Sequence, residues 1–427
     1  MAATVLRGVR SADGTVGDLA FDKGRLIDPA DAGRGARRID AAGLMVLPGL
    51  VDLHTHLREP GREDAETVRT GTLAAARGGY TACFAMPNTD PVADTAEAVR
   101  RLAALGRRDG AAEVIPVGAI TYGLAGRETT DFQRLHEAAG VTVFSDDGRC
   151  VRDAAVMRAA FQAVRRFGGV LAQHSQDDDL AGPRACCGSP ARAERLGLPE
   201  WPAVAESAIV ARDVQLAQDS GGALHVCHVS TAESVEILRW AKARGLPVTA
   251  EATPHHLLLG AAAVETLDTV YKVNPPLRDD EDAEALRAGL ADGAIDAVAT
   301  DHAPHAPADK ALPFPEARPG MIGLEQSLAA VMETMILTGR LSWPALVQRM
   351  SAAPARIGGA ADRQGRRLAV GEPAAFVLID PTRRTLVNRE DSLSKSRNNP
   401  YHGLDLPDPV VLTCWRGQLT YDGLAAA

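Results

Sequence analysis

The stretch Gly49-Leu-Val-Asp-Leu-His-Thr-His-Leu-Arg58 joins a short apolar run to a group of polar side chains. The apolar run is typical of a buried β-strand, and side chains two residues apart on a strand project to the same side. His54 and His56 therefore face one point, where both imidazoles can reach a single metal ion. A bare H-x-H pair is a weak signal, because such pairs arise by chance in many proteins. The remainder of the chain has to show whether other ligands join this pair.

Seven further apolar runs follow, separated by stretches with helical periodicity. One such helix, Val156–Val164, is expected to stop before Gly168. Another is expected to begin at Ser230, with Glu233 completing a capping box. Eight strands alternating with helices predict an α/β fold of the (β/α)8 TIM-barrel type, and a doubly wound open sheet is the alternative. The eight predicted strands are Gly49–His54, Thr81–Met86, Val114–Ile120, Val141–Ser145, Val170–His174, Leu224–Val229, Val248–Ala252 and Ile295–Thr300.

Both ends of the chain have a different texture, with short β-branched runs interrupted by Gly and Asp. We expect small antiparallel strands there, and a single β-sandwich domain to which the two ends contribute jointly. The predicted boundaries are 1–48 for the N-terminal part, 49–355 for the barrel and 356–427 for the C-terminal part. The predicted strands are Thr4–Val9, Val16–Phe21, Gly24–Ile27, Leu44–Leu47, Ala375–Ile379 and Val410–Trp415.

The bulk composition limits the possible partners. The 427 residues carry a formal net charge of −9, with 46% hydrophobic and 24% charged residues. These are ordinary globular values without a basic stripe, so we expect no nucleic-acid partner. Residues 1–10 lack the apolar core of a signal peptide and no run of about 18 apolar residues occurs, which predicts a cytoplasmic protein without a membrane span. Six cysteines without a C-x-x-C pair indicate reduced thiols.

Polar residues follow the predicted strands at the ends where a barrel carries its active site. For any one of these histidines, a hydrogen-bonded core imidazole is as good an interpretation as a metal ligand. Four imidazoles and two carboxylates at successive strand ends are difficult to explain by packing alone, because buried polar groups without partners cost free energy. Nitrogen and oxygen ligands without cysteine favour zinc, with manganese, cobalt or iron as substitutes. Five or six ligands exceed one tetrahedral ion, so we expect one or two zinc ions, and a pair would be bridged by a carboxylate.

Seven motifs in this chain resemble those of the bacterial dihydroorotases of the amidohydrolase superfamily. The resemblance follows the chain in order over nearly its whole length. The motifs are D-L-H-T-H-L-R-E-P-G at 52–61, M-P-N-T at 86–89, H-V-C-H-V-S-T at 225–231, P-H-H-L at 254–257, K-V-N-P-P-L-R at 272–278, A-T-D-H-A-P-H at 299–305 and S-K-S-R-N-N-P at 394–400.

The resemblance implies the reversible, zinc-dependent cyclisation of N-carbamoyl-L-aspartate to (S)-dihydroorotate and water, a step of de novo pyrimidine biosynthesis. His54 and His56 would bind the more buried zinc, and His174 and His228 the second. Asp301 would contact the first ion and act as the catalytic proton carrier. The end of the fourth predicted strand offers Asp146 and Asp147 and no lysine. This resembles the subgroup that has an aspartate in place of a carboxylated lysine. Asp147 is favoured as the bridging ligand, and Asp146 stays open as the alternative.

The resemblance also implies a set of substrate-binding groups at the barrel mouth. Arg58 would bind the ring carboxylate through two parallel donors. The set is completed by His56, Asn88, Asn274 and His305, with backbone groups around Pro319 and Gly320. This chain departs from the expected pattern at two places, with Gln176 where an acidic residue is expected and Pro319 where an apolar or aromatic residue is expected. The loop 306–320 is rich in Pro and Ala and is expected to cover the mouth.

Two other functions compete with this interpretation. Another cyclic amidohydrolase, such as an allantoinase or a dihydropyrimidinase, would share the histidine pair but normally uses a lysine bridge. An inactive barrel that scaffolds an aspartate transcarbamoylase would lose metal ligands, whereas every ligand position is filled here. We expect a homodimer, and association of an active enzyme with aspartate transcarbamoylase stays open.

Overall fold

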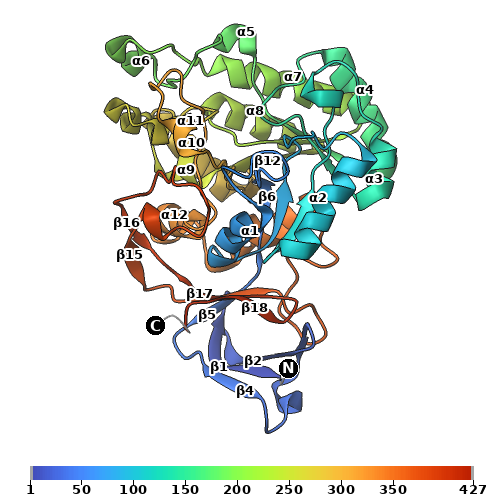
Figure 1. Ribbon diagram of the computed structural model, residues 1–427, viewed down its shortest axis with the longest axis vertical. Coiled ribbons are helices and arrows are strands. Elements are labelled where there is room, and N and C mark those ends of the chain that lie inside the picture. The colour runs from blue at the N-terminus through green and yellow to red at the C-terminus, as the bar shows by residue number, and fades with distance from the viewer. Residues whose placement is uncertain (1–2, 425–427) are drawn as a thin grey trace.

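The computed structural model describes residues 3–424, which form a large α/β part and a smaller β part that holds both chain ends (Figure 1). All eight predicted strands of the large part are present. Parallel pairing joins the first three strands into one sheet and the following five into another. The strands are β6 (Leu50–Thr55), β7 (Tyr80–Ala85), β8 (Glu113–Pro116), β9 (Val143–Phe144), β10 (Val170–Gln173), β11 (Ala223–Val226), β12 (Val248–Ala252) and β13 (Ala297–Val298).

The two sheets close into a barrel, which excludes the open doubly wound sheet. Parallel bridges join Gly118 to Phe144 between β8 and β9, and Thr55 to His302 between β6 and the end of β13. The second closure is reinforced by Asp52, whose carboxylate accepts hydrogen bonds from the backbone N–H of Thr300 at 2.9 Å and from its hydroxyl at 2.5 Å. The prediction of a (β/α)8 barrel is confirmed.

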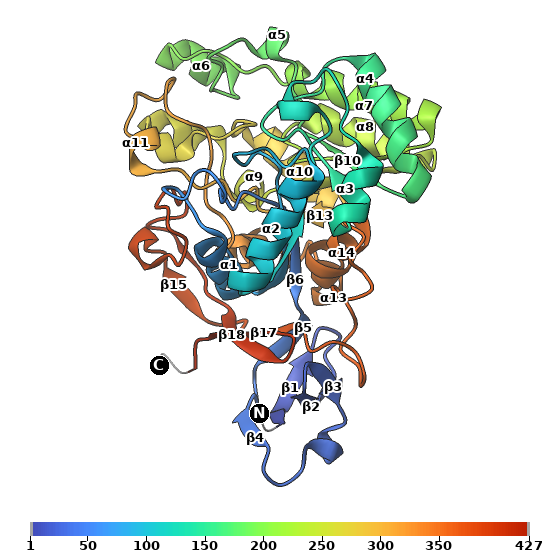
Figure 2. The ribbon, with the colours of Figure 1, turned by 45° about the vertical axis from the view of Figure 1, so that its right-hand side comes forward.

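Helices surround the barrel, and three short ones lie in loops beyond its mouth. Helix α4 buries Met157, Ala160, Phe161 and Val164, the stripe predicted from the sequence. Figure 2 shows α5 and α6 at the end far from both termini. The main helices are α1 (Val68–Arg77), α2 (Ala96–Asp109), α3 (Phe132–Ala139), α4 (Ala154–Val164), α7 (Val204–Ser220), α8 (Ala232–Ala243), α9 (Pro254–Leu258), α10 (Asp280–Asp292), α12 (Ser327–Val331), α13 (Trp343–Val347) and α14 (Ala353–Ile357), and the loop helices are α5 (Asp178–Ala181), α6 (Pro190–Leu196) and α11 (Pro307–Lys310).

The predicted N-cap of α8 is wrong by one residue. Thr231, and not Ser230, is the N-cap, because its hydroxyl accepts the N–H of Ser234 at 3.3 Å. The hydroxyl of Ser230 is instead bonded to the buried carboxylate of Glu206 on α7. A tertiary partner therefore displaced the local capping box.

The strands from the chain ends form one mixed sheet in the order β18-β17-β14-β5-β1-β2-β3, with β4 also pairing to β1. Most neighbouring strands pair antiparallel, as expected, whereas β1 pairs in parallel with both β4 and β5. The sheet curls on itself, so that Phe21 meets Phe376 at 5.4 Å between ring centroids although their strands are not neighbours. The strands are β1 (Thr4–Ser11), β2 (Val16–Asp22), β3 (Arg25–Ile27), β4 (Arg37–Asp40), β5 (Met45–Pro48), β14 (Phe376–Ile379), β17 (Val410–Trp415) and β18 (Gln418–Asp422).

One segment of the C-terminal part leaves this sheet and lies against the barrel. β15 (Arg384–Leu386) and β16 (Asp405–Pro407) form a separate pair, and the chain between them includes residues 394–400 beside the barrel mouth. Neither strand was predicted, and nor were β4 and β18. The domain boundaries given above stay a prediction. Among residues 3–424, no helix combines the length and apolar character needed to cross a membrane.

Candidate metal centre and substrate cavity

Six polar side chains converge at the mouth of the barrel, two from the end of β6 and one each from the ends of four other strands or the turns behind them. Parallel strands of a closed barrel end at the same rim, which brings residues far apart in the sequence to one place. All six are at most 5% exposed. They are His54, His56, Asp147, His174, His228 and Asp301.

The carboxylate of Asp147 lies at the centre of this group. Its Oδ1 is 3.1 Å from Nε2 of His54 and 3.6 Å from both Nδ1 of His174 and Nε2 of His228. Its Oδ2 is 3.3 Å from Nε2 of His56. One carboxylate thus faces four imidazoles, which is the arrangement that a ligand bridging two cations requires.

Asp301 closes the group from the opposite strand. Its Oδ1 lies 3.0 Å from Nε2 of His56 and 3.5 Å from Nε2 of His54. Burial opposes the charge of this carboxylate, but the neighbouring His54 and His56 more than offset burial and lower its pKa. Burial also opposes the charge of Asp147, but His54, His174 and His228 outweigh burial and hold the pKa of this carboxyl well below its usual value. Both carboxylates are therefore ionised and able to bind a cation.

The polar atoms at the centre are arranged so that they could hold a metal ion. Nε2 of His54 and Oδ1 of Asp147 are buried without a hydrogen-bond partner. The other ring nitrogen of His54 lies 2.8 Å from Oε1 of Glu251, and a carboxylate can only accept there. Nε2 of His54 then faces the carboxylates of Asp147 and Asp301. Burial opposes a charge on this ring, but the two carboxylates raise its pKa, so this position favours a cation, either the ring proton or a metal ion that replaces it.

The sequence analysis missed the residues that orient these ligands. Glu251 on β12 is fully buried and also lies 2.9 Å from Nε2 of His225. Asn88 accepts at 2.9 Å from Nδ1 of His56, so it supports a ligand as well as lining the cavity. The signal for Glu251 was present, since a single carboxylate in the apolar run Val248–Ala252 requires a buried partner.

The two aspartates after β9 have different surroundings. Oδ1 of Asp146 accepts the backbone N–H groups of Ile120 at 2.8 Å and Thr121 at 2.9 Å. Its Oδ2 accepts the hydroxyl of Thr121. Asp146 therefore supports the loop after β8, and it is Asp147 that faces the histidines.

Gln176 stands where an acidic residue was expected, and its amide links the two sides of the site. Its Oε1 lies 2.8 Å from Nε2 of His174 and accepts from Nδ2 of Asn274 at 3.0 Å. An amide oxygen can accept the N–H at Nε2 of His174, and Nδ1 of that ring lies 2.8 Å from Nε2 of His228 and 3.6 Å from Oδ1 of Asp147.

A cavity of about 210 Å³ opens above the six side chains. Arg58 lies in its wall, with Nε donating to the carbonyl of Pro304 at 3.1 Å. Burial lowers the pKa of this guanidinium to about 10, so it is charged at neutral pH. The cavity brings together every predicted site residue except His54, which is buried behind it: His56, Arg58, Asn88, Asp147, His174, His228, Asn274, Asp301, His305, Pro319 and Gly320.

The loop 306–320 approaches the cavity through its last residues. Gly320 has a φ of +147°, and a Cβ there would lie 2.7 Å from Nε2 of His305, so only glycine fits this approach. The carbonyl of Pro319 accepts from Nε2 of His305 at 2.8 Å. Burial, with Arg58 and Lys310 nearby, lowers the pKa of His305 to about 3, which keeps this imidazole neutral.

Three site residues have backbone conformations in the left-handed region. The φ angles are +59° at Arg58, +31° at His228 and +45° at Asp301. Such angles cost free energy for residues with a side chain and occur where the surrounding structure imposes them, often at functional sites. They lie here at two proposed ligands and at the guanidinium beside them.

A (β/α)8 barrel with a small β domain from the chain ends is the fold of the cyclic amide hydrolases among the solved structures. The structure superposes on an L-hydantoinase (dihydropyrimidinase) from Arthrobacter aurescens with a TM-score of 0.88 over 99% of this chain and 97% of that chain, at 24% identity. At that identity the likeness shows the fold alone.

Sequence comparison identifies the family within this class. Residues 43–234 match the family model described as dihydro-orotase-like. A protein named dihydroorotase from Streptomyces coelicolor is 51% identical over 424 residues, which are 98% of each chain. Another of that name from Mycobacterium tuberculosis is 47% identical over 433 residues and 98% of each chain. The chain therefore belongs to the dihydroorotase family.

Proposed function

We propose that this protein catalyses the reversible cyclisation of N-carbamoyl-L-aspartate to (S)-dihydroorotate and water. The observation that carries the proposal is the charged guanidinium of Arg58, which lines the same cavity as the histidine and aspartate group. Cyclic amides without a carboxylate give a charged guanidinium no partner, whereas the ring carboxylate of dihydroorotate accepts two parallel hydrogen bonds from it. The relatives named dihydroorotase support the same substrate.

We propose zinc as the metal, with one or two ions in the site. His54, His56 and Asp301 would hold the first ion, His174 and His228 the second, and Asp147 would bridge the two. A set of nitrogen and oxygen donors without sulfur suits zinc. Zinc would supply a Lewis acid that activates water at neutral pH and polarises the ring amide carbonyl.

The side chains have separate roles in the proposed reaction. Arg58, with Asn88, Asn274 and His305, binds and orients the substrate, because these donors to its carboxylate and amide groups line the cavity. The backbone at Pro319 and Gly320 closes that side. Asp301 takes a proton from the attacking water on its carboxylate and passes it to the departing ring nitrogen. In the biosynthetic direction the same carboxylate takes a proton from the nitrogen that closes the ring and gives it to the oxygen that leaves as water.

The direct test follows the ultraviolet absorbance of dihydroorotate after mixing with the purified protein. We expect the absorbance to fall, the fall to stop after chelation, and zinc to restore it. Dihydrouracil, hydantoin and allantoin serve as matched rings without the carboxylate, and faster turnover of any of them would point to another cyclic amidohydrolase. Unchanged dihydroorotate absorbance with a zinc-loaded sample would refute the proposal, and a sample without stoichiometric metal would favour the inactive scaffold.

We also propose that the active form is a cytoplasmic homodimer able to associate with aspartate transcarbamoylase. These proposals rest on the resemblance to bacterial dihydroorotases. Light scattering after size-exclusion chromatography, with and without the transcarbamoylase of the same cell, tests both associations. A monomer that elutes unchanged in the mixture would contradict them.

A further inference from the structure

Residues 394–398, here called the strap, belong to the C-terminal part of the chain but lie against the barrel mouth. The strap is polar, yet Ser394, Ser396 and Asn398 are each at most 5% exposed. Buried polar side chains are nearly always hydrogen-bonded, so the partners of these residues show what the strap holds.

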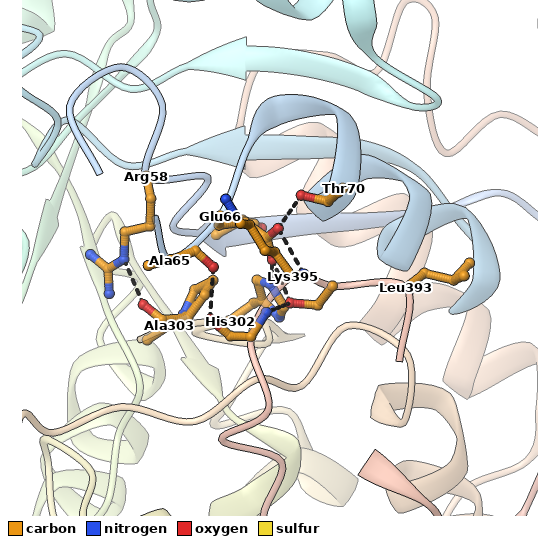
Figure 3. Close-up of polar contacts among 12 residues, drawn as sticks. Arg58, Ala65, Glu66, Thr70, His302, Ala303, Leu393 and Lys395 are labelled. Atoms are coloured by element: carbon orange, nitrogen blue, oxygen red, sulfur yellow. Dashed lines mark hydrogen bonds and ion pairs between the residues drawn. The ribbon is translucent and has the colours of Figure 1, made fainter. Parts of the chain in front are cut away.

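Glu66 anchors the beginning of the strap to the barrel. This carboxylate is fully buried in the turn before α1 and accepts from the hydroxyl of Ser394 and, at 3.1 Å, from the N–H of Lys395. Its Oε2 also lies 3.3 Å from Nε2 of His302 (Figure 3). His302 follows Asp301 directly, and its carbonyl accepts the N–H of His56 at 2.9 Å. The anchor therefore lies one residue away from a proposed metal ligand.

Asn398 joins the two segments that form the substrate side of the cavity. Its Nδ2 donates to the carbonyl of Ala303 at 2.9 Å and to the carbonyl of Gly320 at 3.0 Å. Its Oδ1 accepts the N–H of His305 at 3.3 Å. One amide thus bonds to the loop after β13 and to the end of the covering loop, and both donors and the acceptor are used.

The same contacts support Arg58. Asn398 holds Ala303 and His305, the residues on either side of Pro304, and the carbonyl of Pro304 accepts from Nε of Arg58. The hydroxyl of Ser396 adds contacts of 2.9 Å to the carbonyl of His305 and 2.7 Å to the carbonyl of Ala65. Figure 3 shows the side chain of Arg58 on one side of Ala303, and Glu66, His302 and Lys395 on the other side.

We propose that the strap positions the substrate-binding side of the site, with Asn398 as the positioning residue that fixes Arg58, His305 and Gly320 relative to one another. Asn398 does not line the substrate cavity, so it acts through these groups and not on the substrate. The inference rests on the proposed function for its kinetic consequence, and on the hydrogen bonds alone for its structural one.

The kinetic test compares Asn398→Asp and Asn398→Ala with Asn399→Ala. Asn399 is the matched control, because it is equally buried but bonds to Gln326 and to the N–H of Tyr401, away from the cavity. Asn398→Asp keeps the shape but turns a carboxylate toward two carbonyls, so we expect it and Asn398→Ala to raise KM for dihydroorotate about ten-fold or more, with kcat and zinc content changed less than about three-fold. A merely structural role predicts that both Asn398 variants lower the stability of the protein while KM for dihydroorotate stays near the wild-type value. Equal KM values for the Asn398 and Asn399 variants would overturn the proposal.

Hydrogen exchange tests the strap independently of the substrate. We expect the backbone amide of His305 to exchange about ten-fold faster in Asn398→Ala than in Asn399→Ala, because only the former loses its acceptor. A wild-type protein that leaves dihydroorotate unchanged would refute the proposed function, and the exchange result would still decide the strap. Equal exchange at His305 in both variants would overturn the positioning role.

Discussion

At the scale of single residues, His54 illustrates how the protein prepares a ligand for a cation. Its Nδ1 lies 2.8 Å from Oε1 of Glu251 and donates to it, which turns Nε2 toward the carboxylates of Asp147 and Asp301. The second carboxylate oxygen of Glu251 is held by His225. Such partners set both the orientation and the basicity of a metal-binding imidazole. The chemistry of the site therefore depends on residues that never touch the substrate.

Arg58→Gln tests whether the guanidinium selects a carboxylate. Loss of a charge-assisted, bidentate pair in a buried cavity costs about 2–4 kcal/mol, so we expect KM for dihydroorotate to rise about 30-fold to 1,000-fold. Steady-state kinetics measure the change. Arg58→Lys is the control that keeps the charge without the two parallel donors of the guanidinium. Its KM should lie between the values of the wild type and Arg58→Gln. An unchanged KM in Arg58→Gln would remove Arg58 from substrate binding.

Asp301→Asn tests the proton carrier. Asparagine keeps the size of the side chain but cannot accept the proton, so we expect kcat to fall about 10²-fold to 10⁴-fold. Circular dichroism and zinc analysis establish that the fold and the metal content survive the change. Near-normal kcat in a fully loaded variant would exclude Asp301 from proton transfer.

At the scale of elements, α7 positions the strand ends from behind. Glu206 accepts the N–H groups of Ser230 and Thr231, both at 3.1 Å, and so fixes the turn that follows His228. Two turns farther along α7, the carboxylate of Asp213 accepts from Nε2 of Gln173 at 3.0 Å, next to His174. A single helix thus orients the ends of β10 and β11 together.

Asp213→Asn should change how stability depends on pH. Burial raises the pKa of Asp213 from 3.8 to about 6, although Arg212 and Gln173 favour its charged form. Between these two pKa values the folded protein keeps a proton that the unfolded chain has released, so this group lowers the stability of the wild type as pH rises from about 4 to 6. The loss amounts to about 3 kcal/mol. The variant lacks this slope, and its stability relative to the wild type should increase by that amount over the same range.

Urea unfolding at half-unit steps between pH 4 and pH 7 measures the difference. Asp219→Asn on the same helix is the control, because Asp219 is half exposed and pairs with Arg158 at the surface. Parallel stability curves for the wild type and Asp213→Asn would contradict the prediction.

At the scale of the whole molecule, the site depends on segments from three parts of the chain. The hydrogen bonds of Asp52 with Thr300 close the barrel between its first and last strands. The curled sheet of the chain ends packs Leu47, Val377 and Val410 into the same apolar cluster as the barrel helices. The segment that returns from this sheet carries the strap to the mouth. Folding of the two parts and assembly of the site are therefore coupled.

Removal of the metal should lower the stability of the whole protein. Without a metal ion, the buried carboxylates of Asp147 and Asp301 have only the neighbouring imidazoles to balance their charge. A ligand that binds only the folded state adds about 4 kcal/mol when its free concentration is 1,000 times Kd. We expect chelation to lower the unfolding midpoint and zinc to restore it, as measured by thermal and urea unfolding.

His228→Asn and His402→Asn are the matched pair for this measurement. His402 is exposed and outside the site, so its variant should show the full zinc-dependent shift, whereas His228→Asn should lose much of it. The same shift in both variants would mean that the metal binds elsewhere.

Much of the fold and most of the site follow from local patterns in the sequence. The apolar runs place eight strands, and the polar residues directly after them, such as His174 and His228, belong to the mouth of any barrel that those strands form. This works because side-chain periodicity and strand ends are properties of a few consecutive residues. The parallel pairing of β1 with β4 and β5 was not predictable in this way, because register and direction are set by partners elsewhere in the chain.

Only the tertiary structure decided which polar groups meet. The sequence alone left Asp146 and Asp147 open, placed the cap of α8 at Ser230, and gave no role to Glu251 or Asn398. Each of these outcomes depends on a partner brought near by folding: Glu251 bonds to His54, 197 residues away, and Asn398 bonds to Ala303, 95 residues away. Hydrogen-bond partners are chosen by the packing of whole elements, whereas the elements themselves are determined by the order of neighbouring residues.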